Sequence, residues 1–263
     1  MSGRKIKSIS IILPAYKQER TITEDIKNLE NFLSGLTISY EIIVVVDGLE
    51  DNTYKNAKKI SNKNIKVFYF KNNCGKGYAV KFGMAKAKGD AIGFIDAGMD
   101  LEVNGIGLLL DYMLLQDADI IIGSKLHPDS VVKYPMQRKV LSWGYRTLTK
   151  VLFGFSVRDT QVGLKLFRKK VAKDVFPRLV VKRFAFDVEM LAVSYAIGYK
   201  RIYEAPIKLK FNWGSTIANI TSGSFWRVIF SMLWDTVAVF YRLKILHYYE
   251  RQRSNKNILN KCS

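Results

Sequence analysis

The chain is poor in cysteine and histidine. Its 263 residues include two cysteines, two histidines and five prolines. Two cysteines in a chain of this length exclude a secreted, disulfide-stabilised scaffold, and we therefore expect a reducing compartment. The two histidines, His127 and His247, have no neighbours in the sequence that suggest catalysis.

Long uncharged apolar runs are also absent. None reaches the roughly 20 residues that a membrane-spanning helix needs. The apolar run at 9–15 contains Pro14 and lacks a small-residue cleavage site, so we interpret it as a strand and not as a signal peptide. Hydrophobic residues make up 48% of the chain and charged residues 25%, a globular composition that excludes disorder and suits one large α/β domain or two small ones.

Acidic residues are too few to balance the basic ones, and the formal net charge is +19. Residues 138–183 carry +11, residues 200–263 carry +8, and the remainder is neutral. We expect these two stretches to face a shared anionic partner, either a membrane surface or a nucleic acid. Charge alone supports nucleic-acid binding weakly, because the sequence has no helix-turn-helix, zinc or RNA-recognition signature.

The first 125 residues alternate short β-branched runs with longer helical patterns, which is typical of βαβ units and a mostly parallel sheet. Ligands bind such sheets at the carboxyl ends of the strands. We predict strands at 8–13, 41–46, 65–70, 91–95 and 119–122, and helices near 21–35, 52–61, 76–88 and 104–116.

Polar residues or glycines follow every predicted strand. Each group alone could form a turn, but five groups along one edge predict a binding site. The glycine-rich segment at 75–77 matches neither the Rossmann nor the P-loop pattern. Lys76 is a candidate phosphate contact at a helix start, and the alternative is a solvated surface lysine. The groups lie at 14–16 with Glu19, at 47–48, at 73 and 75–77, at 96–100 and at 123–125.

Asp96 and Asp100 are the candidate metal ligands, because Mg²⁺ and Mn²⁺ take oxygen donors and share them with substrate phosphates. The alternative for Asp100 is a cap on the following helix.

These motifs, in this order, resemble glycosyltransferase family 2 with the GT-A fold, and within it the polyprenyl-phosphate (dolichyl-phosphate) mannosyl- and glucosyltransferases. The resemblance covers about residues 8–216. The family's Pro-Ala-Tyr-Asn-Glu-Glu opening corresponds to 14–19, and its Val-Asp-Asp-Gly-Ser turn to 45–49. The most specific strings are Asp-Thr-Gln-Val-Gly-Leu-Lys-Leu-Phe at 159–167 and Arg-Phe-Ala-Phe-Asp-Val-Glu at 183–189.

The resemblance implies a GT-A α/β fold, with a mostly parallel sheet flanked by helices. It implies a catalytic domain over 1–214, with 1–95 mainly binding nucleotide and 96–214 forming the metal and acceptor side. Asp96 would hold Mg²⁺ or Mn²⁺. The chain departs from the family at Lys17, Gln18, Val46 and Gly98, and Asp100 is the candidate replacement for the carboxylate missing at 98. The residues implied to hold the donor nucleotide are Pro14, Ala15, Tyr16, Glu19 and Asp47, with Lys76 nearby.

The implied reaction is inverting transfer of a hexose from a UDP-glucose-type or GDP-mannose-type donor to a polyprenyl or dolichyl phosphate. A phosphate monoester is largely dianionic at neutral pH, with a second pKa near ~6, so it needs cations and no general base. Asp159 and Gln161 would position the reacting groups near the metal, whereas Asp187 and Glu189 are either catalytic or structural. The candidate cations for the acceptor phosphate are Lys125, Arg138 and Arg146.

Two other functions are compatible with the sequence. A family 2 enzyme acting on a saccharide hydroxyl in cell-surface polysaccharide assembly would need a carboxylate base. A non-catalytic binding or scaffold protein is the alternative of another class, because Gly98 removes a metal-ligand position.

The segment 215–263 is predicted to be a basic, amphipathic, membrane-associating region. Its apolar stretch at 225–246 carries a narrow polar stripe, within about 80° at helical spacing, and a helix lying in the interface tolerates such charges. The alternative is a core helix packed on the sheet. We expect residues 130–155 and 215–250 to form a membrane-facing surface of a peripheral protein on the cytoplasmic face. The stripe comprises Arg227, Ser231, Asp235 and Arg242.

Overall fold

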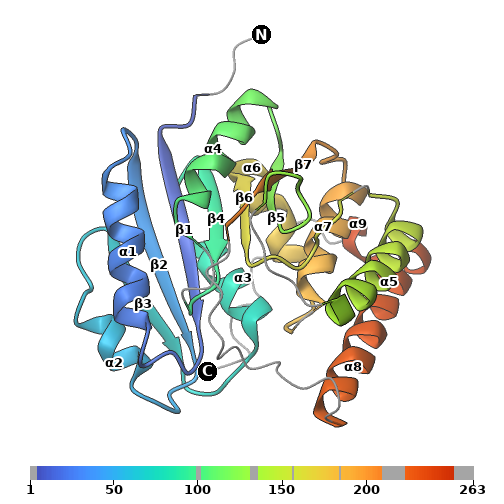
Figure 1. Cartoon of the computed structure of the whole chain (residues 1–263), viewed down its shortest axis with the longest axis horizontal. Helices are drawn as coiled ribbons and strands as arrows, with labels where there is room; N and C mark the ends of the chain where they lie inside the picture. The colour runs from blue at the N-terminus through green and yellow to red at the C-terminus, as the bar shows by residue number, and fades with distance from the viewer. Residues whose placement is uncertain are drawn as a thin grey trace.

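The computed structural model describes residues 5–98, 102–130, 136–155, 157–183, 185–208 and 223–251, without the side chains at 136–142, 223–226, 228 and 251. Its centre is a seven-stranded sheet in the order β3-β2-β1-β4-β6-β5-β7 (Figure 1). Only the pairings of β6 with β4 and β5 are antiparallel. The strands are β1 (Ser8–Ala15), β2 (Ser39–Asp47), β3 (Ile65–Phe70), β4 (Ala91–Ile95), β5 (Ile120–Ser124), β6 (Leu164–Arg168) and β7 (Ile202–Pro206).

Helices cover both faces of the sheet (Figure 1). The α-helices are α1 (Ile22–Ser34), α2 (Thr53–Lys58), α3 (Lys76–Lys86), α4 (Gly105–Leu115), α5 (Met136–Phe153), α6 (Lys169–Val175), α7 (Phe186–Ala196), α8 (Gly223–Phe240) and α9 (Tyr248–Arg251). A 3-10 turn, η1 (Phe176–Arg178), follows α6, and a π-helical turn, η2 (Tyr241–Ile245), follows α8.

Successive residues of the strands enter two separate hydrophobic cores, because side chains alternate across a sheet. Ile12 of β1 packs in the core that includes residues of α3, α6 and α7, whereas Ile11 and Leu13 pack in the core under α1, α2 and α4. Both faces of β1 are buried, which explains its nearly continuous apolar sequence.

The five strands and four helices predicted from the sequence are confirmed, with small shifts at their ends. Strands β6 and β7 were not predicted, and β6 inserts antiparallel between β4 and β5. Because β6 runs the opposite way, it begins at the edge where β4 and β5 end. The segment before β6 therefore lies beside the carboxyl ends of both strands. The predicted domain boundary at 214/215 lies outside the described residues and stays a prediction.

Helices α5 and α8 lie side by side at one end of the molecule (Figure 1). The Tyr145 hydroxyl lies 2.8 Å from Thr236 Oγ1, and the Phe153 and Phe240 rings are 6.3 Å apart. Val239 of α8 is fully buried in a core. Trp234, on the other side of α8, is 76% exposed. One apolar face of α8 therefore packs against α5 and the core, as in a core helix. Another apolar face is exposed, as in an amphipathic helix at an interface. Among the residues that the structure describes, no helix is long and apolar enough to cross a membrane.

Candidate active site

Asp47, the last residue of β2, fixes the backbone at the start of α3. Its carboxylate is buried and accepts hydrogen bonds from the backbone N–H groups of Cys74 (2.7 Å) and Gly75 (2.8 Å). Burial raises the pKa of Asp47, although these two N–H groups favour the ionised form. Asp47 therefore joins the end of β2 to the helix that carries Lys76.

The other predicted nucleotide-binding residues come from the end of β1 and the loop after it. Pro14 and Ala15 are the last residues of β1 and are buried. The Tyr16 hydroxyl donates to the Glu50 carboxylate at 3.0 Å. Glu19 Oε2 accepts the Asn52 backbone N–H at 3.1 Å. These contacts join the loops after β1 and β2, so the structure brings together the predicted nucleotide-binding residues of both strands.

Asp96 follows β4, and its backbone and side chain both lie against Gly163. The Asp96 N–H donates to the Gly163 carbonyl at 2.9 Å. A Cβ on Gly163 would lie 1.9 Å from Asp96 Oδ2, so only glycine leaves room for this carboxylate. Oδ1 of Asp96 is buried and accepts no hydrogen bond of normal geometry from the residues that the structure describes.

A carboxylate at a strand end, with one oxygen that accepts no hydrogen bond and has only a lysine ammonium close to it among the described residues, fits a hard divalent cation. Mg²⁺ in particular takes one or two protein carboxylates and completes its shell with water and substrate phosphates. The second predicted ligand, Asp100, lies outside the described residues. Within the described ranges, no group of three or more His, Cys, Asp or Glu side chains could hold a metal. Asp96 is therefore the carboxylate on which the metal assignment rests.

Gly98 has a backbone conformation that explains the missing aspartate at this position. Its φ is +114°, a value that side chains disfavour. Its N–H donates to Asp25 Oδ2 of α1 at 3.0 Å. An aspartate at 98 would be strained in this loop, so substituting Gly98 would not simply restore the family's second carboxylate.

Lys76 is the first residue of α3, and its ammonium group contacts Asp96. Lys76 Nζ lies 2.8 Å from Oδ1 and donates to Oδ2 at 2.9 Å, and it lies 3.6 Å from Asp187 Oδ2. Burial disfavours the ammonium ion, but the charges of Asp187 and Asp96 outweigh it and raise the pKa of Lys76. The alternative of a solvated surface lysine is wrong, because its side chain is 32% exposed and ion-paired with Asp96.

Behind Lys76 lies a buried ion pair between Lys165 of β6 and Asp187 of α7. Lys165 is fully buried and donates to Asp187 Oδ1 at 2.5 Å and to the Val162 carbonyl at 2.6 Å. Burial alone would raise the pKa of Asp187, but the ammonium groups of Lys165 and Lys76 hold it below its usual range. The four side chains Asp96, Lys76, Asp187 and Lys165 thus form an alternating, formally neutral chain of charges.

The residues predicted for the acceptor side include Asp159, Gln161 and Lys125, which lie where the segment before β6 meets the end of β5. Asp159 Oδ2 accepts the Lys125 backbone N–H at 2.9 Å, and the Asp159 N–H donates to Glu204 Oε1 of β7 at 2.9 Å. Gln161 Nε2 donates to Met232 Sδ of α8 at 3.0 Å. The structure therefore brings Asp159 to Lys125 and places Gln161 against α8.

Two predicted acceptor residues lie on α5. Arg138 belongs to its first turn, and its side chain is outside the described residues. Arg146 is half-buried in the same helix. Both arginines remain predictions as acceptor contacts.

Glu189 is separate from this chain of charges. It is fully buried, and it accepts hydrogen bonds from the Val180 and Val181 backbone N–H groups and from the Tyr249 hydroxyl at 2.6 Å. These contacts join α7 to the preceding loop and to α9, which favours the structural alternative for Glu189.

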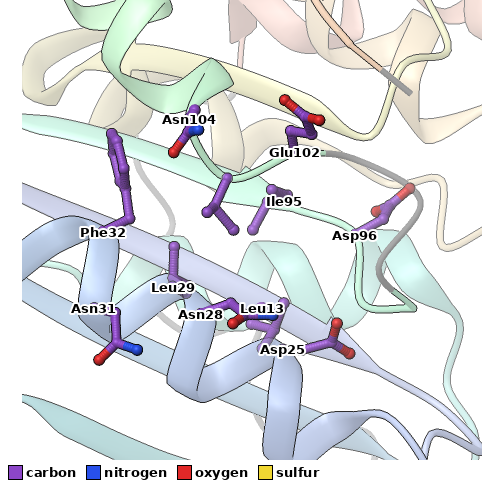
Figure 2. Close-up of a pocket in the computed structure, with 11 residues that line it drawn as sticks. Leu13, Asp25, Asn28, Leu29, Asn31, Phe32, Ile95, Asp96, Glu102 and Asn104 are labelled. Carbon is purple, nitrogen blue, oxygen red and sulfur yellow. The ribbon is translucent and has the colours of Figure 1, made fainter. Parts of the chain in front are cut away.

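A hollow of about 350 Å³ adjoins Asp96 on the side of α1 and α4. Figure 2 shows Leu13 and Ile95 of the sheet between the two helices, with Asp96 at one end. The remaining lining residues are Asp25, Asn28, Leu29, Asn31 and Phe32 from α1, with Glu102, Val103 and Asn104 before α4.

Sequence reasoning missed Lys165, Asp25 and Glu204 as parts of this edge. Lys165 did leave a signal, because it is a lone lysine within the apolar string Leu-Lys-Leu-Phe. Asp25 and Glu204 left none, since each binds a backbone N–H from a segment distant in the sequence.

Comparison with known proteins identifies the family. The model of "Glycosyl transferase family 2" matches residues 10–176, which is more than half of the chain. The chain belongs to glycosyl transferase family 2. Dolichyl-phosphate beta-glucosyltransferases from Dictyostelium discoideum and Drosophila melanogaster are 33% and 34% identical to this family member, each over 71% of the chain. The chain spans about 62% of the length of these two relatives.

Solved structures confirm the GT-A fold. Glucosyl-3-phosphoglycerate synthase from Mycobacterium tuberculosis, in complex with Mn²⁺, UDP and phosphoglyceric acid, superposes with a TM-score of 0.66 at 18% identity, covering 89% of this chain and 78% of that one. Mannosyl-3-phosphoglycerate synthase from Rubrobacter xylanophilus gives a TM-score of 0.67 at 15% identity, with 95% and 77% coverage. At these identities the likeness concerns the fold alone.

Proposed function

We propose that this family 2 chain is an inverting hexosyltransferase that moves a hexose from a nucleotide-diphosphate sugar to a polyprenyl or dolichyl phosphate at a membrane surface. An acceptor phosphate oxygen attacks C1 of the hexose, the bond from C1 to the diphosphate oxygen breaks, and the nucleoside diphosphate leaves with the bonding electrons. The names of the relatives support this acceptor and favour glucose as the sugar.

The contacts of the carboxylates at the site favour one kind of acceptor, a phosphate, over a sugar hydroxyl. Asp47 and Asp159 accept backbone N–H groups, whereas Asp96 and Asp187 are paired with lysines. A sugar hydroxyl needs a carboxylate free to take its proton. A phosphate acceptor is already anionic and needs none. The engagement of all four carboxylates therefore supports a phosphate acceptor over a saccharide hydroxyl.

The donor side has the parts that diphosphate departure needs. A divalent cation on Asp96 would supply charge stabilisation for the leaving diphosphate. Lys76 adds a positive charge near Asp96, at the amino end of α3, where the helix dipole also favours an anion. Asp47 holds the backbone that carries Lys76 in place.

The surface of α8 supports a place at the membrane. Large exposed side chains recur at helical spacing along α8 and into η2, and we call them the aromatic stripe: Phe230, Trp234 and Val237 of α8 and Tyr241 of η2. Arg227 and Lys244, near the two ends of the stripe, are exposed and basic. An apolar helix face with tryptophan and basic flanks fits the headgroup region of an anionic membrane, at the depth of a lipid phosphate. We propose peripheral attachment at the cytoplasmic face.

The test is transfer of radiolabelled hexose into a lipid fraction. Purified protein is incubated with UDP-glucose or GDP-mannose, with Mg²⁺ or Mn²⁺, and with either a polyprenyl phosphate or a saccharide acceptor. We expect label in the lipid fraction only. Transfer to the saccharide alone would contradict the proposal, and no transfer to any acceptor would support a non-catalytic protein.

Asp96→Asn is expected to lower the metal-dependent rate by about 10²-fold or more, since the charge stabilisation of the leaving group depends on it. Asp111→Asn is the matched control, because Asp111 is an exposed residue of α4. The control should retain wild-type turnover.

A further inference from the structure

The ammonium group of Lys76 is paired with the carboxylate of Asp96, to which the proposed function assigns a metal. Its ammonium group lies within 2.9 Å of both oxygens of Asp96. A divalent cation bound to Asp96 would place two positive centres against one carboxylate, and they would repel each other strongly in this partly buried setting. The lysine and the cation therefore compete for Asp96.

The structure holds a second partner for the same ammonium group. Asp187 Oδ2 lies 3.6 Å from Lys76 Nζ, so a small rotation of the lysine brings it into closer contact. The other oxygen of Asp187 is held by Lys165, which is itself fixed by the Val162 carbonyl. The Phe94 ring lies beneath both ammonium groups, at 5.5 Å from that of Lys76 and 5.3 Å from that of Lys165. Asp187 is thus an alternative ion-pair partner for Lys76, and Lys165 holds its carboxylate in place.

We propose that Lys76 is an exchangeable counter-ion: it neutralises Asp96 before a divalent cation binds, and it moves to Asp187 when the cation takes its place. Asp187 is then a positioning residue that acts through Lys76, and Lys165 positions Asp187. This inference rests on the metal site of the proposed function and is independent of the acceptor.

The exchange makes metal binding depend on the donor. Without a nucleotide, the cation must displace a lysine that is already well paired, so its affinity for Asp96 is low. With a nucleotide diphosphate present, the displaced ammonium gains a diphosphate oxygen as well as Asp187. Cation and nucleotide therefore bind more tightly together than either does alone.

The test measures Mn²⁺ binding without donor or acceptor, from the loss of the free Mn²⁺ signal in electron paramagnetic resonance. Lys76→Met removes the competitor, and we expect it to tighten Mn²⁺ binding by about tenfold, the effect of removing one close charge partner. Lys86→Met is the matched control, since Lys86 is an exposed lysine at the other end of the same helix. The control should bind Mn²⁺ as the wild type does.

A double variant that preserves the net charge tests the role of Asp187 as the second partner of Lys76. Lys165→Met with Asp187→Asn removes one buried lysine and one buried carboxylate together, so no unpaired buried charge remains. Lys76 is then left with Asp96 alone, and we expect Mn²⁺ binding several-fold weaker than in the wild type. Adding Lys76→Met to this pair should restore the affinity of the Lys76→Met single variant. Cooperative thermal unfolding confirms that each variant is folded.

Adding UDP or GDP separates competition from a merely structural effect. The wild type should gain Mn²⁺ affinity, whereas Lys76→Met should gain less, because it lacks the ammonium that the diphosphate engages. Equal Mn²⁺ affinities of the wild type and Lys76→Met without nucleotide, or weaker binding by Lys76→Met, would overturn the exchange and leave the proposed function intact. If no variant binds Mn²⁺ with or without nucleotide, the metal-dependent function fails and the exchange fails with it.

Discussion

Glu189 is a fully buried carboxylate, and three hydrogen-bond donors converge on it. Two are backbone N–H groups of the loop before α7, and the third is the Tyr249 hydroxyl. Burial outweighs these donors and the charge of Arg242, and it raises the pKa of Glu189 above its ordinary value of 4.5. The folded protein therefore binds a proton at a pH where the unfolded chain has already released it.

This proton linkage predicts a pH-dependent stability difference between the wild type and Glu189→Gln. The wild-type contribution is fully present at low pH, and it is lost as the pH rises through the raised folded-state pKa, because the folded state there binds more protons than the unfolded state. We expect the free energy of unfolding of the wild type, relative to the variant, to increase as the pH falls from 8 towards 5. Guanidinium melts of both proteins at several pH values measure this difference. A difference independent of pH would show that the carboxyl group has an ordinary pKa.

Asp187 and Glu189 also show what the sequence could not decide. Both lie in the first turn of α7, and the sequence leaves each as either catalytic or structural. Residues two apart on a helix point to roughly opposite sides. Asp187 therefore meets Lys165 of β6, whereas Glu189 meets the loop before the helix and α9. Their partners come from other segments, so spacing along the chain does not reveal their roles.

At the scale of elements, β6 and β7 are the two strands that the sequence analysis did not predict, and β6 organises the site. Its string Leu-Lys-Leu-Phe-Arg contains a buried lysine where a strand pattern requires an apolar residue. The lysine is tolerated because Asp187 of α7 neutralises it, and that contact is not visible in a local pattern. Strands β1, β4 and β5 were predictable because their apolar runs are buried on both faces and need no such partner.

The start of β6 provides a test of the geometry around Asp96. A Cβ on Gly163 would lie 1.9 Å from Asp96 Oδ2, so Gly163→Ala must displace this carboxylate. We expect transfer activity to fall by about 10²-fold, because a shift of about 1 Å in a catalytic group has this effect. The cost in stability should be about 1–3 kcal/mol, as for other overpacked sites. Rates of hexose transfer and thermal melts measure the two effects.

Gly144→Ala is the control, since a Cβ at this position of α5 would meet nothing within 4 Å. It should leave the rate unchanged and stabilise the helix by about 0.5–1 kcal/mol. Full activity of Gly163→Ala would show that the placement of Asp96 against Gly163 is not required for transfer.

On the scale of the whole molecule, the unusual feature is an apolar face that remains exposed next to a basic C-terminal region. The sequence predicted an amphipathic helix from a narrow polar stripe, but hydrophobicity could not decide which apolar side would pack. In the structure Thr236 and Val239 are buried, whereas Trp234 and Phe230 are exposed. Packing against Tyr145 and Phe153 of α5 fixes this choice, and these contacts span more than 80 residues of sequence.

If the aromatic stripe contacts a membrane, Trp234→Asp should weaken binding to vesicles that contain anionic lipid. Transfer of a tryptophan-sized side chain from water contributes about 2 kcal/mol, so we expect a loss of roughly 10- to 100-fold in vesicle affinity. Stability should change by less than about 0.5 kcal/mol, because Trp234 is 76% exposed.

Leu115→Asp is the matched control, since Leu115 of α4 is 81% exposed and lies outside the stripe. Flotation with vesicles at low and high salt separates the apolar contribution from that of the +19 net charge, because salt weakens only the electrostatic part. An equal loss in both variants, or none in Trp234→Asp, would mean that this face of α8 does not contact the lipid.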